Sequence, residues 1–109
     1  MVASNTPDSY GRTALHDASR YGFTEGVRYL VERGADVNKR DDFGDTALYK
    51  ASENGHLEVV RALLEAGAGA DVRRLNDEGY TPISCACRGK HMEVFRALVE
   101  AGGDVDTPD

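Results

Sequence analysis

The chain has 109 residues, enough for one small domain with a modest hydrophobic core. Its net charge of -6 disfavours nonspecific nucleic-acid binding, because contacts to phosphates require clustered Lys and Arg. No apolar run approaches the roughly 20 residues that cross a bilayer, and the starting residues MVASNTPD lack the apolar stretch of a secretory signal. We therefore expect an intracellular protein, cytoplasmic or nuclear, that binds neither nucleic acid nor membranes.

The same sequence frame occurs three times along the chain. Its copies begin at Gly11, Gly44 and Gly79, which are 33 and 35 residues apart. The two additional residues of the longer spacing fall between Gly67 and Asp71, where we expect them to lengthen a surface connection at little cost in free energy. Repetition at this period is typical of a stacked array, because one copy alone cannot bury its apolar face.

Each copy predicts a pair of helices. A threonine whose hydroxyl can cap the first helix occurs in every copy: Thr13, Thr46 and Thr81. Glycine then allows a left-handed turn in the first two copies, at Gly22 and Gly55. The second helix carries apolar residues on one face: Val27, Leu30, Val31, Val60, Leu63, Leu64, Phe95, Leu98 and Val99. A further glycine ends each second helix: Gly34, Gly67 and Gly102.

Two positions depart from the shared frame. Lys90 stands where the first two copies have glycine, and a left-handed conformation there costs roughly 1 to 2 kcal/mol unless Gly89 shifts the turn. Gly26 falls inside the second helix of the first copy, where the other copies have valine, and it costs about 1 kcal/mol relative to alanine. We therefore expect the first copy to be the least stable of the three.

Several segments at fixed offsets resemble the ankyrin repeat. Residues 13–16 (TALH), 46–49 (TALY) and 81–84 (TPIS) are similar to the T-P-L-H segment of that family. Residues 55–60 (GHLEVV) and 34–38 (GADVN) are similar to its middle and closing segments. The resemblance extends from about Asp8 to Asp106, nearly the whole chain, and it is specific because many positions agree in all three copies.

The resemblance implies an all-α fold, an ankyrin-repeat α-solenoid of stacked helix-turn-helix units with projecting β-turn or hairpin loops. It also implies one domain, 1–109, with repeats at about 8–40, 41–75 and 76–106 and with tails at 1–7 and 107–109. In that family the histidine matching His16 helps to fix its turn by hydrogen bonding. Tyr49 and Ser84 take its place in the other two copies, where we expect them to lack the same bonding capacity.

The sequence contains no arrangement typical of a catalytic or metal site. Cys85 and Cys87 lie about 200 degrees apart around a helix, so they cannot chelate one metal ion or form a redox pair. Cys87 occurs at the offset of two serines, where we expect a small packed residue. The histidines have no Cys, Ser or carboxylate at the spacing of a triad or a zinc site: His16, His56 and His91. We therefore expect no enzyme activity, no cofactor and no metal.

The resemblance further implies where a partner binds, because ankyrin proteins commonly use the turn tips and the inner side of the first helices. At the turn tips these positions are Tyr10, Arg12, Asp42, Phe43, Asp45, Asp77, Glu78 and Tyr80. On the first helices they are Asp17, Arg20, Tyr21, Lys50, Glu53, Asn54 and Arg88. Exposed aromatic residues on turns are typical interface anchors, unless each ring instead folds over its neighbouring turn.

These observations favour a noncatalytic module that binds another protein. An alternative is a stoichiometric inhibitor or regulator of an enzyme such as a kinase, because acidic tip residues suit a basic target: Asp42, Asp45, Asp77 and Glu78. The third copy keeps a full apolar set, and the sequence stops where another copy would begin. We therefore expect a small adaptor, a fragment of a larger ankyrin-containing protein, or a protein that self-associates weakly through an uncapped end.

Overall fold

The computed structural model describes residues 13–102, which fold into three helix pairs without a β-strand. The elements are α1 (Ala14–Arg20), α2 (Thr24–Glu32), α3 (Ala47–Glu53), α4 (Leu57–Glu65), the 3-10 helix η1 (Ala68–Arg73), α5 (Pro82–Arg88) and α6 (Met92–Glu100). Repeat one comprises α1 and α2, repeat two comprises α3, α4 and η1, and repeat three comprises α5 and α6. None of these helices has the length and apolar character needed to cross a membrane.

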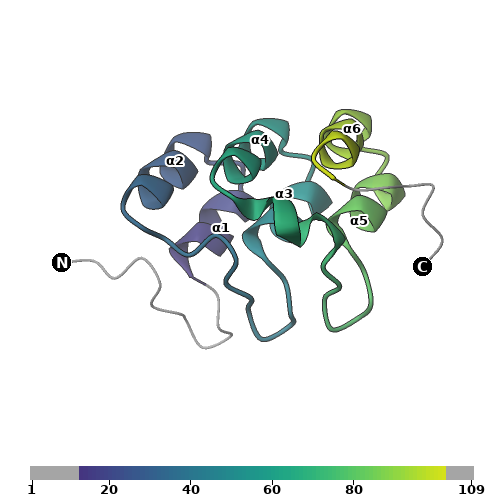
Figure 1. Cartoon of the computed structure of the whole chain (residues 1–109), viewed down its shortest axis with the longest axis horizontal. Helices are drawn as coiled ribbons and strands as arrows, with labels where there is room; N and C mark the ends of the chain where they lie inside the picture. Colours follow the sequence, from purple (N-terminus) through teal and green to yellow (C-terminus); the bar gives the residue numbers. More distant parts are fainter. Residues whose placement is uncertain (1–12, 103–109) are drawn as a thin grey trace.

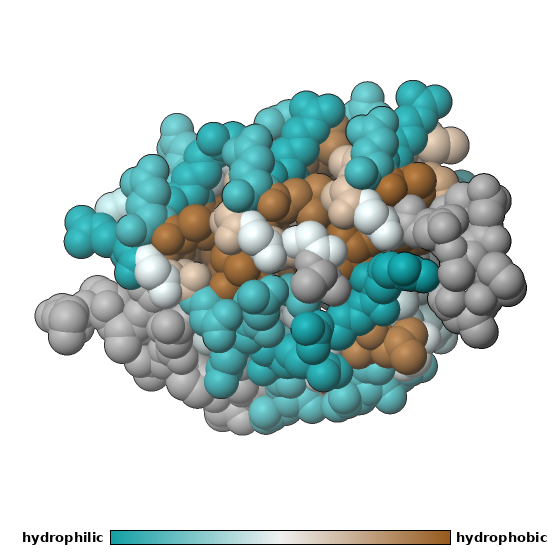
Figure 2. Space-filling model, viewed as in Figure 1, coloured by the Kyte–Doolittle hydropathy of each residue, from teal (hydrophilic) through white to brown (hydrophobic). Residues whose placement is uncertain are grey.

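The helices form two rows, which Figure 1 shows from the side. The inner row consists of α1, α3 and α5, the outer row consists of α2, α4 and α6, and neighbouring helices within each row are in contact. The turns that connect successive repeats project from the inner row. Apolar residues gather between the rows as a band that crosses the molecule in Figure 2. This stack of helix pairs confirms the expected all-α solenoid.

Each inner helix begins with the expected threonine cap. The hydroxyls of Thr13, Thr46 and Thr81 accept the backbone N–H three residues later, at 3.4, 3.1 and 3.1 Å. In α1 the bond is returned, because Nδ1 of His16 accepts the N–H of Thr13 at 3.0 Å. Ser84 does the same for Thr81 through its Oγ at 2.9 Å. The expectation that Ser84 lacks this capacity is therefore wrong for the local bond, since a hydroxyl reaches the cap as well as an imidazole does.

The tight turn between the two helices of each repeat contains a left-handed residue. Gly22 and Gly55 both have a φ of 74°, and Lys90 has a φ of 61° at the same offset. Gly89 has a φ of -82°, so it does not shift the turn, and the strain of the left-handed conformation falls on lysine. The expected left-handed conformation at Lys90 is thus confirmed.

The two additional residues of repeat two lie in the connection that follows α4. This connection forms η1, a six-residue 3-10 helix that packs against α4 and α5, with Ala68, Asp71 and Val72 fully buried and Gly69 exposed. Ala68 and Val72 match Ala35 and Val37 of repeat one, which are also buried. The insertion thus lengthens the connection, and the repeat spacing does not indicate the 3-10 helix that it forms. Oδ1 of Asp71 accepts a bond from Nε of Arg74 at 2.8 Å, and burial raises the pKa of this carboxyl.

Candidate functional site

The turn before α3, residues 41–45, is built around one carboxylate oxygen. Oδ1 of Asp41 accepts the N–H groups of Phe43 and Asp45, both at 2.9 Å. The N–H of Asp41 donates in return to the carbonyl of Asp45, also at 2.9 Å. Such side-chain bonds close a turn without a partner strand. Asp42 and Phe43 are left exposed at the apex, and 52% of the surface of Phe43 is accessible.

The turn before α5, residues 76–80, has the same construction with an amide in place of the carboxylate. Oδ1 of Asn76 accepts the N–H groups of Glu78 and Tyr80 at 3.0 and 2.9 Å, and the N–H of Asn76 donates to the carbonyl of Tyr80 at 2.8 Å. Asp77 and Glu78 are exposed at this apex. The Tyr80 ring packs against the Arg88 guanidinium, whose Cζ lies 4.3 Å from the ring centroid. Tyr80 is therefore held beside α5.

The two turn tips are bonded to each other. The N–H of Asp77 donates to the carbonyl of Phe43 at 3.0 Å. Arg40 adds a second link, since its Nη2 donates to the carbonyl of Leu75 at 3.0 Å and its Nε donates to that of Gly44 at 3.3 Å. Backbone atoms and one arginine thus hold the two apexes at a fixed spacing.

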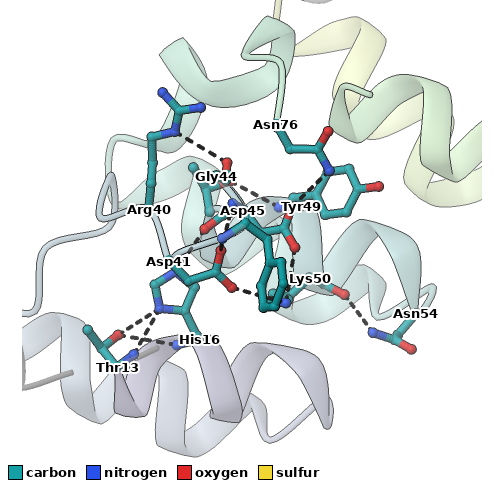
Figure 3. Close-up of polar contacts among 12 residues, drawn as sticks. Thr13, His16, Arg40, Asp41, Gly44, Asp45, Tyr49, Lys50, Asn54 and Asn76 are labelled. Atoms are coloured by element: carbon teal, nitrogen blue, oxygen red, sulfur yellow. Dashed lines mark hydrogen bonds and ion pairs between the residues drawn. The ribbon is translucent and has the colours of Figure 1, made fainter. Parts of the chain in front are cut away.

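A buried ionic network lies beneath the tips, as Figure 3 shows. Nζ of Lys50 lies 3.2 Å from Oδ2 of Asp41 and 3.1 Å from Oδ2 of Asp45, and the Lys50 side chain is 11% exposed. Nδ2 of Asn76 donates to Oδ1 of Asp45 at 2.9 Å, which attaches the third repeat's turn to the second repeat. Both oxygens of Asp45 and the Lys50 ammonium are therefore engaged inside the molecule.

This network corrects the expected placement of two predicted partner-binding residues. The sequence places Asp45 and Lys50 on the exposed surface, but Asp45 is buried and its carboxylate contacts Lys50 and Asn76. Two buried carboxylates require an internal cation, so Lys50 stabilises the scaffold below the tips. The turn-building residues Asp41 and Asn76 are absent from the predicted set. Their signal in the sequence is an Asp or Asn three positions before the glycine that opens each copy.

All three histidines tie one repeat to its neighbour. Nδ1 of His16 accepts a backbone N–H, so Nε2 carries the proton and donates to the carbonyl of Asp45 at 3.0 Å. Nε2 of His56 lies 3.0 Å from the carbonyl of Arg20, and Nε2 of His91 lies 3.2 Å from that of Glu53. The turn-fixing role expected for His16 is confirmed. Burial lowers the pKa of His16 and keeps its ring neutral, although the nearby Asp41 carboxylate opposes this shift.

Two family models match the chain. One, described as "Ankyrin repeats (3 copies)", matches residues 37–109, and another, described as "Ankyrin repeats (many copies)", matches residues 2–49. The chain belongs to the ankyrin repeat family. No curated protein matches it. Ankyrin repeats are generally noncatalytic modules for protein–protein interaction.

This ankyrin protein exposes most of the predicted partner-binding residues. Those exposed are Asp17, Arg20, Tyr21, Asp42, Phe43, Glu53, Asn54, Asp77, Glu78, Tyr80 and Arg88. They lie on the two described turn tips and on or at the ends of the three inner helices, and two of them, Asp17 and Tyr21, line the groove on the end face of repeat one. Tyr10 and Arg12 lie outside the described residues. Contact between these side chains and a partner protein remains a prediction.

The two cysteines of the ankyrin repeats have opposite environments. Cys85 is buried, and burial raises the pKa of its thiol to about 12, so the thiolate needed for nucleophilic chemistry does not form at neutral pH. Cys87 is exposed, and the expectation of a packed residue at this offset is wrong. Its counterparts, Ser19 and Ser52, are buried under the following repeat, whereas no described residue covers Cys87.

Among residues 13–102 no group of three or more His, Cys, Asp or Glu is arranged to hold a metal ion.

Proposed function

We propose that the chain is a noncatalytic interaction module that binds a partner protein through its turn tips and the exposed side of its inner helices. The observation that carries this proposal is the backbone bond of 3.0 Å between the N–H of Asp77 and the carbonyl of Phe43. Because this bond orders two apexes before any partner arrives, binding loses less conformational entropy than it would with independent loops. The general use of ankyrin repeats in protein–protein interaction supports the same conclusion.

Two aromatic side chains are the anchors of the proposed surface. Phe43 stands at one apex with half of its surface accessible, and Tyr80 stands beside the other with its ring stacked on Arg88. Aromatic rings supply a large contact area at a small cost in side-chain entropy, and arginine often accompanies them at interface centres. The exposed carboxylates of Asp77 and Glu78 next to these rings would orient a partner by charge.

A pair of double variants tests this surface. Phe43→Ala with Tyr80→Ala removes both anchors, and Glu58→Ala with Arg61→Ala removes exposed side chains of the outer row as a matched control. The wild-type chain first captures its partner for identification by mass spectrometry, and calorimetry then measures the partner's Kd for each purified variant. We expect the tip variant to bind at least about 10-fold more weakly, and the outer-row variant to bind like the wild type.

Thermal unfolding of the same variants separates binding from folding. The tip variant should keep a Tm close to that of the wild type, because both rings lie on turns outside the apolar band. A large fall in Tm would show that the rings pack within the repeats instead. Loss of binding in the outer-row variant, with the tip variant unaffected, would place the partner on the other side of the molecule.

The acidic apexes support a second candidate function, stoichiometric inhibition of an enzyme that has a basic surface. Asp42, Asp77 and Glu78 are exposed, and none of them forms an ion pair within the described part of the chain. Asp45 does not join them, since Lys50 already neutralises it. If the captured partner is an enzyme, its activity should fall at equimolar chain, and less at high salt. Unchanged activity in the complex would favour an adaptor.

A further inference from the structure

Within residues 13–102, the two ends of the helix stack expose complementary halves of the interface that joins the repeats. On repeat one, Ala18 and Leu30 line a groove of about 460 Å³. Their counterparts in repeat two, Ala51 and Leu63, are fully buried because repeat one covers them. Repeat one therefore presents an apolar face of the kind that is covered between repeats.

Repeat three exposes the other half of this interface. Cys87 and Phe95 line a groove of about 240 Å³, and Met92 beside them is 58% exposed. At the offsets of Cys87 and Phe95 in repeat two, Ser52 and Val60 are fully buried under repeat three. Since complementary faces on one molecule allow head-to-tail association, a second copy of the chain is the obvious occupant of either end.

Inside the stack, however, the interface depends on a histidine that sits on a glycine. The His56 ring lies so close to Gly22 that a Cβ added there would be 2.6 Å from Nδ1. The His91 ring lies over Gly55 at the same separation. Each ring also bonds a carbonyl at the end of the preceding inner helix. A side chain at the glycine position would displace the ring and break this bond.

We propose that Lys90 and Phe23 prevent a second copy of the chain from stacking end to end in this register. Lys90 occupies the glycine offset at the open end of repeat three, and its left-handed φ of 61° directs its Cβ to where the ring of a stacked copy would lie. Phe23 occupies the histidine offset at the open end of repeat one, and its phenyl ring has no nitrogen to donate to a carbonyl. Both sides of the contact are thus altered together.

The environment of Phe23 shows what its ring does instead. It covers Gly26, where an added Cβ would lie 2.5 Å from Cδ2 of Phe23. The other repeats have Val59 and Val94 at this offset, and both are buried. The glycine expected to weaken repeat one therefore makes room for a ring that a stacking copy would have to displace.

The conformation of Lys90 supports the same interpretation. The side chain of Lys90 is exposed, and glycine at a φ of 61° would avoid the strain that lysine incurs there. The lysine therefore does not serve the local turn. It places a Cβ and a charge in a groove that is lined mainly by apolar residues, among them Met92 and Phe95, and both oppose burial under another copy.

Two substitutions at this position test the proposal. Lys90→Gly removes the Cβ and the strain, whereas Lys90→Ala removes the charge but keeps the Cβ. Sedimentation velocity from micromolar to millimolar concentration should show a monomer for the wild type and for Lys90→Ala, but concentration-dependent association for Lys90→Gly. Adding Phe23→His to Lys90→Gly should strengthen the association, because the new ring can bond the carbonyl of Arg88.

The exposed thiol of Cys87 reports which face is involved. We expect a maleimide to label Cys87 of the wild type at a rate that does not depend on protein concentration. In associated Lys90→Gly the labelling of Cys87 should be slower, because stacking covers the thiol. Association of the wild type with slowed labelling of Cys87 would overturn the proposal. So would a chain with Lys90→Gly and Phe23→His that folds and stays monomeric, or equal association of Lys90→Gly and Lys90→Ala. Circular dichroism confirms folding of each variant, and Lys90→Gly should be at least as stable as the wild type.

Discussion

The junction between repeats one and two differs in chemistry from the junction between repeats two and three. At the first, the neutral ring of His16 reaches across to the carbonyl of Asp45. At the second, Tyr49 stands at the same offset without such a side-chain bond, and the amide of Asn76 reaches back to the carboxylate of Asp45 instead. Asp45 thus accepts a hydrogen bond from each neighbouring repeat. Its backbone carbonyl accepts the bond from repeat one, and its carboxylate accepts the bond from repeat three. The same stacking register thus accommodates a ring-to-carbonyl bond and an amide-to-carboxylate bond, in addition to the His56 and His91 bonds that the two junctions share.

The largest effect should come from removing Lys50, the cation between the two buried carboxylates of the turn 41–45. Lys50→Met leaves the carboxylates of Asp41 and Asp45 facing each other in a buried site without their counter-ion. We expect a loss of about 3 to 5 kcal/mol in the free energy of unfolding, measured by urea titration. Lys50→Arg keeps the charge and should lose less. A loss below about 1 kcal/mol would show that the two carboxylates are adequately solvated without Lys50.

The second junction should be broken selectively by Asn76→Asp. The variant keeps the oxygen that builds the turn, but it replaces the amide donor with a carboxylate oxygen facing Asp45. We expect a loss of about 2 to 3 kcal/mol, because a buried bond becomes a like-charge contact. A double-mutant cycle with Asp45→Asn should recover part of this loss. Hydrogen exchange should quicken more in α5 than in α1, and a uniform change would contradict a junction-specific effect.

The first junction should weaken in acid, through His16. Its pKa is lowered by burial, so from about pH 6.5 downward the unfolded chain binds the proton before the folded protein does. The free energy of unfolding should therefore fall from about pH 6.5 until the pH has passed the folded pKa. Urea unfolding of the wild type and of His16→Gln measures this, and the variant should lack this part of the slope.

An opposing contribution makes that paired comparison necessary. Burial raises the pKa of Asp71, so protonation of its carboxyl favours the folded state as the pH falls toward the unfolded value of about 3.8. This contribution is common to the wild type and to His16→Gln, and it cancels in their difference. An NMR titration in which His16 takes its proton at or above the ordinary histidine pKa would contradict the prediction.

The smallest effect is expected on the outer row, away from both junctions. Arg61 lies 3.7 Å from Glu58, and both side chains are more than half exposed. Arg61→Ala should change the free energy of unfolding by less than about 0.5 kcal/mol, as measured by urea titration, because solvent screens exposed pairs. This variant sets the scale against which the junction variants are judged. A change of about 2 kcal/mol would mean that the outer row also couples the repeats through charge.

The elements that depend on local chemistry could be predicted from the sequence. Threonine caps, left-handed glycines and the apolar side of the outer helices each follow from a few neighbouring residues, and all are found as expected. The exposed or buried state of single polar residues could not. Asp45 is buried because Asn76 and Lys50 converge on it, and Cys87 is exposed because no described residue lies over it. Both depend on neighbours in three dimensions that residue spacing does not encode.

The bond between the two turn tips also bears on how new binding specificities can arise. Its donor is the main-chain N–H of Asp77 and its acceptor is the main-chain carbonyl of Phe43. Any residue except proline supplies that N–H, and every residue supplies that carbonyl. The side chains at the two apexes can therefore be exchanged while the geometry that presents them is conserved. Mutation, natural or directed, can explore recognition at these positions without first having to rediscover a stable fold.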